Sequence, residues 1–180
     1  MWKKLSSKIV FSHPWMEVIE DKVQLPNGDL TTYLTTTPGR RGITVIALDS
    51  QNNVLLQDEY SYPIGHRMLE FPGGGIGKEE SVEAAVKREL LEETGYECND
   101  IEVLGWYYTS NRRCDMKMYV AIARNLTWVG TKHEAEESPV PQWHSIQQLE
   151  QLLTEQKIYN GTVLAAWAMA RSSCAGAVFD

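Results

Sequence analysis

The segment 73-GGGIGKEESVEAAVKRELLEETGYE-97 joins a run of glycines to a helix-like pattern that is rich in glutamate. It holds seven of the 24 acidic residues in the chain. Residues 81–94 follow a helical period, and Gly95 supplies the C-terminal stop that such a helix requires. We therefore predict a helix over 81–94, with a glycine loop before it.

Three glutamates of this helix extend its inward face. The apolar stripe that includes Val82 and Ala85 continues, by the i, i+3, i+4 rule, to Glu89 and Glu93, and Glu92 lies beside them. Like charges at this spacing repel one another, and the helix dipole disfavours anions near the C-terminus. A divalent cation removes this conflict, because Mg2+ takes oxygen ligands. The pattern therefore predicts a metal site.

Simpler interpretations of the segment stay open. An acidic helix face is often solvated and stabilised by pairs such as Glu83 with Lys87. A glycine run is often an ordinary flexible loop, although Gly73, Gly74 and Gly75 could bring bare backbone close to a ligand. No Walker-type GKS or GKT is present, so the glycines do not indicate a P-loop.

The segment resembles the Nudix box, G-x5-E-x7-R-E-U-x-E-E-x-G-U, in which U is a bulky apolar residue. Every fixed position matches at the correct spacing, although the final U is aromatic here and is more commonly aliphatic. The matching residues are Gly74, Glu80, Arg88, Glu89, Leu90, Glu92, Glu93, Gly95 and Tyr96.

This resemblance implies a metal-dependent hydrolase of nucleoside diphosphates linked to another group. By the family pattern, Glu89 and Glu93 are the main ligands of Mg2+, with Mn2+ as an alternative ion. Glu92 is a further ligand or a base that acts on water, and the backbone carbonyl of Gly73 completes the metal site. Metal-assisted attack by water on a pyrophosphate is the implied chemistry.

Two further residues of the box are expected to support this site. Arg88 is implied to pair with the glutamates and orient them, which makes it part of the catalytic set. Glu80, at the start of the helix, is expected to be a structural or secondary carboxylate.

The rest of the chain predicts an α+β fold. Residues 1–40 have the alternation and turn signals of β structure, 43–49 indicate a buried strand, and helices are expected at 146–156 and from about Gly161. No regular βαβ rhythm is present. The resemblance implies an α/β/α sandwich with a mixed sheet between helices. We expect a small β subdomain at 1–40 and a Nudix domain at 41–180.

Features outside the box resemble the branch that cleaves ADP-ribose and related nucleotide sugars. Glu70 matches a glutamate before a Pro-x-Gly turn, and we predict that it contacts substrate. In that branch a glutamate of a late acidic loop acts as general base or extra metal ligand. Glu137 is the best positional match, with Glu134 and Glu136 as alternatives. An exposed, mobile acidic loop is the simpler interpretation of all three.

Two positions depart from the pattern of this branch. Ser61 stands where most relatives carry an arginine, and the segment after the following strand lacks the usual Pro-Gly pair. A substrate-binding arginine is therefore expected from Arg112 or Arg113, which could equally be solvent-facing loop residues.

An aromatic side chain is expected to stack on the nucleobase of the substrate. Trp15 is our candidate, and Tyr60 and Tyr107 are alternatives. Packing in the core or at an interface is the simpler interpretation for each of them.

Composition limits the classes of partner. The chain has 180 residues, is 43% hydrophobic and carries a formal charge of -7, which argues against binding a nucleic-acid backbone. It has no signal-like segment and no apolar run long enough to span a membrane. Cys98, Cys114 and Cys174 lack metal-like spacing, so we expect free thiols in the cytoplasm. A homodimer is an expectation from the family alone.

The leading hypothesis is Mg2+-dependent hydrolysis of ADP-ribose or a related nucleoside diphosphate sugar. Its products are a nucleoside monophosphate and a sugar phosphate. A hydrolase of dinucleoside polyphosphates or other nucleotides is the first alternative. A non-catalytic, nucleotide-sensing Nudix domain is another, although it has no need of Glu89, Glu92 and Glu93. An isomerase of isoprenoid diphosphates would require a catalytic cysteine and further metal-binding histidines, which we cannot place.

Overall fold

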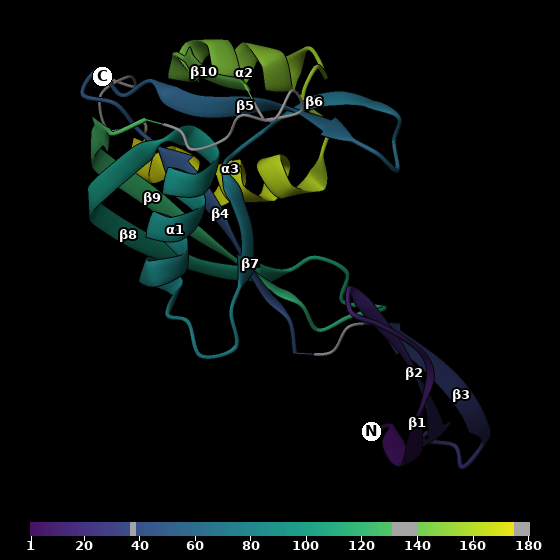
Figure 1. The fold of residues 1–180 in the computed structure, drawn as a ribbon. Coiled ribbons are helices and arrows are strands. Elements are labelled where there is room, and N and C mark those ends of the chain that lie inside the picture. The colour runs from purple at the N-terminus through teal and green to yellow at the C-terminus, as the bar shows by residue number, and fades with distance from the viewer. Residues whose placement is uncertain (37–38, 131–139, 175–180) are drawn as a thin grey trace. The chain divides into compact units, whose positions relative to one another are not determined.

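The computed structural model describes residues 1–36, 39–130 and 140–174. The chain forms two compact units (Figure 1). The first unit is Met1–Arg40 with Tyr108–Lys117, and the second is Arg41–Tyr107 with Met118–Asp180. The division into domains 1–40 and 41–180 stays a prediction.

The first unit is a three-stranded antiparallel sheet. Its strands are β1 (Lys3–His13), β2 (Met16–Gln24) and β3 (Leu30–Thr36), in the order β1-β2-β3. Gly28 closes the turn between β2 and β3 with a φ of 95°, a conformation that favours glycine. The N–H of Thr36 donates to the carbonyl of Arg113 at 2.8 Å, which ties the segment 108–117 to β3. The β structure predicted for the first 40 residues is present.

The second unit contains two sheets and three helices. One sheet has the order β10-β5-β6 and the other β7-β4-β9-β8. The strands and helices are β4 (Arg41–Ala47), β5 (Val54–Ser61), β6 (His66–Glu70), β7 (Gly73–Ile76), α1 (Val82–Thr94), β8 (Tyr96–Tyr108), β9 (Lys117–Trp128), β10 (Val140–His144), α2 (Ile146–Thr154) and α3 (Gly161–Cys174).

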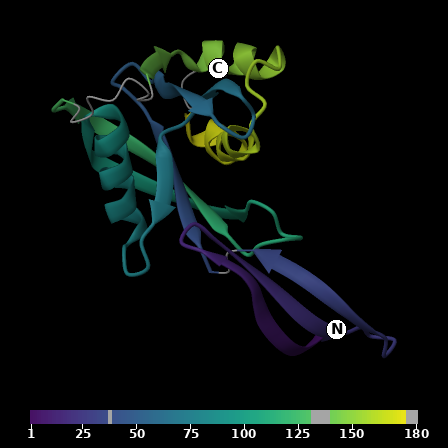
Figure 2. The same cartoon turned by 45° about the vertical axis from the view of Figure 1, so that its right-hand side comes forward.

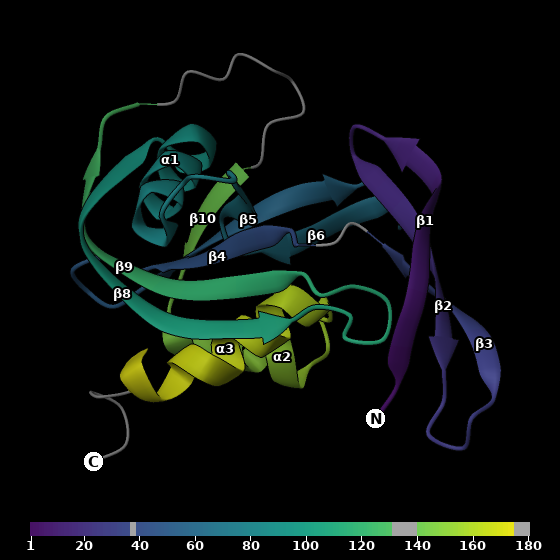
Figure 3. The same ribbon diagram turned by 90° about the horizontal axis from the view of Figure 1, so that it is seen from below.

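Helices cover both faces of these strands, as Figure 3 shows. Side chains of a strand alternate between faces, so a strand buried on both sides must be apolar throughout. On β4, Ile43 and Val45 pack with Val86 and other residues of α1, whereas Ile46 packs in a second core with Trp167 of α3. The predicted α/β/α sandwich is therefore confirmed.

The glycine run differs from the loop that we predicted. Residues Gly73–Ile76 form β7, which pairs antiparallel with β4 in a register that sets Ile43 opposite Gly74. A Cβ atom on Gly73 would lie 2.1 Å from the carbonyl oxygen of Ile43, so no side chain fits there. Glycine is required because two backbones approach each other closely.

Membrane insertion through a helix finds no support in the part of the chain that is described. None of its helices combines the length and the apolar character that a bilayer span requires. Cys98, Cys114 and Cys174 are free, as expected, and Cys98 and Cys174 are buried.

Candidate active site

The helix that carries the acidic residues has clear ends. The Ser81 hydroxyl accepts a hydrogen bond from the Ala84 N–H at 3.1 Å, which satisfies a free donor of the first turn. Gly95 ends the helix with a φ of 74°, and its N–H donates to the carbonyl of Leu91 at 3.0 Å. Between these caps, α1 packs against β7 and β4 (Figure 2). The predicted helix over 81–94 is confirmed.

Glu89 lies in a space that only glycine leaves open. Its side chain belongs to the buried face of α1, and the residue is 8% exposed. A Cβ atom on Gly74 would lie 2.5 to 2.6 Å from the carboxyl atoms of Glu89. Glycine is therefore needed at position 74 because a side chain there would collide with the carboxylate of Glu89, and not because the strand must be flexible.

Glu93 lies one helical turn further on and is also held by β7. Its Oε2 accepts a hydrogen bond from the backbone N–H of Gly73 at 3.0 Å. Burial raises the pKa of Glu93 to about 8, the neighbouring carboxylates Glu89, Glu59 and Glu70 add to the rise, and the Gly73 N–H only partly opposes it. Without a cation nearby, this carboxyl group is protonated at neutral pH.

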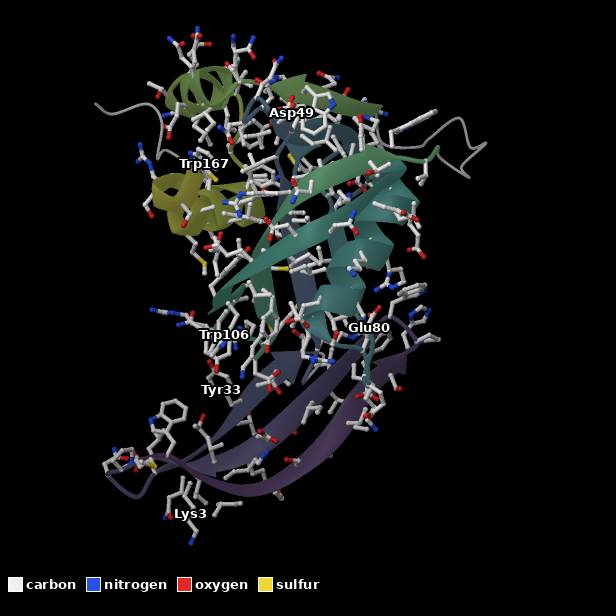
Figure 4. The ribbon with its side chains drawn as sticks, turned by 90° about the vertical axis from the view of Figure 1, so that its left-hand side faces the viewer. Lys3, Tyr33, Asp49, Glu80, Trp106 and Trp167 are labelled. Carbon is white, nitrogen blue, oxygen red and sulfur yellow. The ribbon has the colours of Figure 1, made fainter. Side chains whose placement is uncertain are left out.

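Arg88 links the turn before the helix to the buried face of the helix. Its Nε and Nη2 atoms each lie 2.9 Å from a carboxylate oxygen of Glu80, so the contact is bidentate. Its Nη1 donates to Glu89 at 2.8 Å, and its Nη2 also donates to the carbonyl of Gly75 at 2.8 Å. Hydrogen bonds from Arg88 and from the Gly77 N–H lower the pKa of Glu80 to about 2. Figure 4 labels Glu80 at the start of α1.

Glu92 differs from its two neighbours because it faces solvent. Its side chain is 53% exposed, and its Oε2 accepts a hydrogen bond from Arg88 Nη1 at 3.3 Å. A carboxylate in this position is accessible to water at the edge of the site.

The carboxylates of α1 have the chemistry of a divalent-cation site, although they do not enclose an ion. Among residues 1–36, 39–130 and 140–174, no three Asp, Glu, His or Cys side chains converge closely enough to enclose an ion. The carboxylates of Glu89 and Glu93 instead contact Arg88 and Gly73. The donor set is nevertheless all oxygen, and among the described residues no cationic side chain pairs with the buried carboxyl group of Glu93. The carboxylates of Glu89 and Glu93 repel each other, and a hard divalent cation bound between them would remove this repulsion.

Residues of the β5–β6 pair extend the acidic surface. Gln57 lies opposite Glu70 in the ladder, and Glu59 points to the same face as Gln57 because it is two residues further along β5. Burial raises the pKa of Glu70, and the charge of Glu59 adds to the rise. Gln57 is 1% exposed, and its side-chain amide lies 3.4 Å from the carbonyl of Glu93.

Sequence reasoning missed Gln57, Glu59 and a further residue, Arg41. A polar residue within the apolar run of β5 was a signal that could have identified Gln57, because buried polar groups need partners. Arg41 gave no signal, since its partners lie more than 35 residues away in the chain.

Three of the predicted substrate-binding residues, Trp15, Arg112 and Arg113, belong to the first unit, whereas Glu70 ends β6 in the second unit. Trp15 is 76% exposed at the turn between β1 and β2. Arg113 lies over the ring of Tyr33 with 5.5 Å between its guanidinium carbon and the ring centroid. Arg112 and Arg113, together with Lys4 and Tyr33, line a cavity of about 320 Å³ within this unit.

The remaining predicted residues divide into two groups. Glu134, Glu136 and Glu137 lie outside the described residues, so their roles stay predictions. Tyr60 is exposed, and Tyr107 packs against the core that contains α3, as the simpler interpretation expected.

Two profiles of known protein families match the chain. The profile of the NUDIX domain matches residues 38–166. The chain belongs to the NUDIX family. A second profile, the nucleoside diphosphate sugar hydrolase N-terminal domain, matches residues 2–33. These matches confirm the resemblance that the box predicted, and the chain is a Nudix pyrophosphohydrolase.

Individual relatives of this Nudix chain carry two kinds of name. A methanol dehydrogenase activator from Bacillus methanolicus is 31% identical over 126 residues, which cover 69% of this chain and 67% of that protein. An ADP-ribose pyrophosphatase from Bacillus subtilis is 27% identical over 136 residues, which cover 75% and 72%. The crystal structure of an ADP compounds hydrolase matches with a TM-score of 0.88 and 22% identity, and covers 97% of this chain and 95% of that chain. The last comparison shows a common fold.

Proposed function

We propose that this Nudix hydrolase cleaves the pyrophosphate bond of ADP-ribose or a related nucleoside diphosphate sugar with Mg2+ as its ion. The observation that carries the proposal is the seating of two carboxylates on the glycine strand, Glu89 over Gly74 and Glu93 against Gly73. The match of residues 2–33 to the nucleoside diphosphate sugar hydrolase N-terminal domain supports the substrate class. The name of the Bacillus subtilis relative, an ADP-ribose pyrophosphatase, supports it further.

The residues of the site divide the work of hydrolysis. Glu89 and Glu93 hold the divalent ion, with Glu92 and the carbonyl of Gly73 as further ligands, and Arg88 keeps Glu89 in place. When bound, the ion neutralises the diphosphate and polarises phosphorus. The proton that Glu93 carries without metal leaves as the ion binds, because a ligand carboxylate must be ionised.

Hydrolysis then needs a water molecule and a base. The water oxygen forms a bond to one phosphorus, and the bridging P–O bond breaks with its electron pair on the leaving phosphate. Glu92, which is exposed to solvent, or Glu137 of the late loop takes the proton from water. The products are AMP and ribose 5-phosphate when the substrate is ADP-ribose.

Residues outside the box contribute to substrate recognition in this proposal. The guanidinium groups of Arg112 and Arg113 suit phosphate or sugar oxygens, and Trp15 is exposed and available for stacking on a nucleobase. Glu70 of β6 accepts hydrogen bonds from sugar hydroxyls.

The first unit also supports a homodimer. Strand β1 lies at one edge of the sheet order β1-β2-β3, and Ile9, Val10 and Phe11 on it are all exposed. Exposed apolar residues that cluster on an edge strand mark an association surface. A second copy of the chain is the partner that we propose. Location in the cytoplasm stays a prediction, consistent with the three free cysteines.

Product identification tests the proposed reaction. The protein is incubated with Mg2+ and a panel of ADP-ribose, other nucleoside diphosphate sugars and dinucleoside polyphosphates, and products are separated by chromatography. We expect AMP and ribose 5-phosphate from ADP-ribose, and no turnover after chelation of the metal. Cleavage of dinucleoside polyphosphates alone would support the first alternative, and nucleotide binding without any turnover would support a sensor.

A further inference from the structure

Arg41, at the start of β4, contacts the turn that leads into the Nudix helix. Its Nη2 atom lies 2.6 Å from the carbonyl oxygen of Gly77, 3.0 Å from that of Glu80 and 3.2 Å from that of Lys78. Three backbone carbonyls thus converge on one cationic nitrogen. Hydrogen bonds that involve an ionised donor are shorter and stronger than neutral ones.

The turn that Arg41 holds is compact and closed by its own hydrogen bonds. The N–H of Glu80 donates to the carbonyl of Gly77 at 3.2 Å, and the N–H of Gly77 donates to the carboxylate of Glu80 at 2.8 Å. Arg41 adds a charged donor to the carbonyls of this turn and so ties the turn to the start of β4.

The same turn sets the position of the carboxylates through Arg88. The Glu80 carboxylate receives two hydrogen bonds from Arg88, and Arg88 in turn donates to Glu89 at 2.8 Å. A shift of the turn therefore moves Glu80, and with it the guanidinium that orients Glu89.

The strand that begins with Arg41 pairs with β7, the strand against which the carboxylate of Glu89 lies. In the antiparallel pairing of β4 with β7, Arg41 lies opposite Ile76, and Ile43 lies opposite Gly74. One strand thus supports Gly74, under Glu89, and carries the side chain that fixes the turn before the helix. Strand β4 therefore affects the position of Glu89 in two ways, through the pairing that places Gly74 and through the turn that Arg41 holds.

We propose that Arg41, which lies outside the Nudix box, is a positioning residue for the metal site, because it fixes the turn 77–80 and thereby the Glu80–Arg88–Glu89 chain. The inference rests on the proposed function. A residue that merely stabilised the fold would change the melting temperature and leave metal affinity unchanged. A positioning residue changes metal affinity in protein that remains folded.

Titration with Mn2+, followed by the electron paramagnetic resonance signal of free Mn2+, tests this role without substrate. Arg41→Ala removes all three contacts, and Arg41→Lys keeps a charge with a compact head that cannot span them. Arg124→Ala is the matched control, since Arg124 pairs with Glu102 on β8, away from the turn. Circular dichroism on each variant establishes that it is folded.

We expect the dissociation constant for Mn2+ to rise about tenfold in Arg41→Ala, the scale on which outer partners of ligands act. It should rise by a smaller factor in Arg41→Lys and stay at the native value in Arg124→Ala. Native Mn2+ affinity in folded Arg41→Ala would overturn the inference. If Arg41→Ala does not fold, native affinity in Arg41→Lys would overturn it equally.

A Glu93→Gln arm separates this inference from the proposed function. If the native protein binds Mn2+ and Glu93→Gln does not, the metal site stands, and the Arg41 variants decide the role of Arg41 alone. If the native protein and Glu93→Gln bind Mn2+ equally, the proposed metal site is wrong and the role of Arg41 falls with it.

Discussion

The carboxylate of Glu93 accepts a hydrogen bond from the backbone N–H of Gly73 at 3.0 Å, across 20 residues of sequence. This contact joins the last turn of α1 to the first residue of β7. An N–H donor stabilises the ionised carboxylate, yet burial and three neighbouring glutamates outweigh it, so the pKa stays high. The group therefore holds its proton more tightly than an ordinary glutamate in metal-free protein, and we propose that it exchanges this proton for the ion.

The pH dependence of stability should reveal this proton in metal-free protein. The pKa of Glu93 is about 8 in the folded state against an ordinary 4.5, so the folded protein holds a proton that the unfolded chain releases. Its stabilising contribution is complete below pH 4.5 and is lost as the pH rises to about 8. We expect the melting temperature in EDTA to fall across this window.

Glu93→Gln serves as the control for that measurement, because glutamine has no proton to release. Its melting temperature should depend less on pH than that of the native protein between pH 5 and 8. Glu80 acts in a separate window, since its lowered pKa gives stability that is lost only as the pH falls from 4.5 toward 2. If the melting temperature depended on pH equally in the native protein and in Glu93→Gln between pH 5 and 8, the raised pKa of Glu93 would be contradicted.

Removal of the same carboxylate should abolish most of the activity. Glu93→Gln is expected to lower turnover of the cleaved nucleotide by more than about a hundredfold, because even outer partners of metal ligands typically cost about 10–100-fold. Glu83→Gln, at an exposed position of the first turn of α1, should retain native turnover. Near-native turnover in folded Glu93→Gln would show that Glu93 does not bind the ion.

Two adjacent glycines provide a matched test of the seat for Glu89. In Gly74→Ala the new methyl group would lie about 2.5 Å from the carboxylate, which must move, so metal affinity and turnover should both fall at least about tenfold. A Cβ on Gly75 meets nothing within 4 Å, so Gly75→Ala should behave as the native protein does. Metal titration and steady-state kinetics on both variants provide the comparison. Equal behaviour of the two variants would show that the Glu89 carboxylate is not fixed over β7.

The proposed dimer can be separated from the fold by one substitution on the edge strand. Phe11→Asp places a charge among the exposed apolar residues of β1 and should convert the dimer to a monomer, as measured by light scattering after gel filtration. Leu164→Asp, at an exposed position of α3, is the control and should stay dimeric. A native protein that is monomeric at micromolar concentration would contradict the proposal.

Much of this architecture was predictable from local signals. Ser81 and Gly95 mark the ends of α1, and the apolar period between them identifies the inward face on which Glu89 lies. The buried strand over 43–49 was predictable because an apolar run with β-branched residues suits a strand buried on both sides. These features depend on neighbours in the sequence, which a pattern can report.

Features that depend on distant partners were not predictable in the same way. The run Gly73–Ile76 has almost no side chains to show a period, so its pairing with β4 is invisible in the sequence. The contacts of Gln57 and Arg41 join positions 36 to 39 residues apart. The helical period predicted that Glu89 and Glu93 share the inward face of the helix, and only the structure relates Glu89 to Gly74 and Glu93 to Gly73.

Diffraction from crystals of the protein with Mn2+ and a non-hydrolysable ADP-ribose analogue would locate the ion and the diphosphate in one experiment. We propose that the inward glutamates of α1, which lie against the glycines of β7, hold the ion that receives the diphosphate. We expect an anomalous peak about 2.0–2.4 Å from carboxylate oxygens of Glu89 and Glu93, with the diphosphate of the analogue on the same ion. An ion bound elsewhere, with Glu89 still hydrogen-bonded to Arg88 and Glu93 still hydrogen-bonded to Gly73, would contradict the proposed metal site.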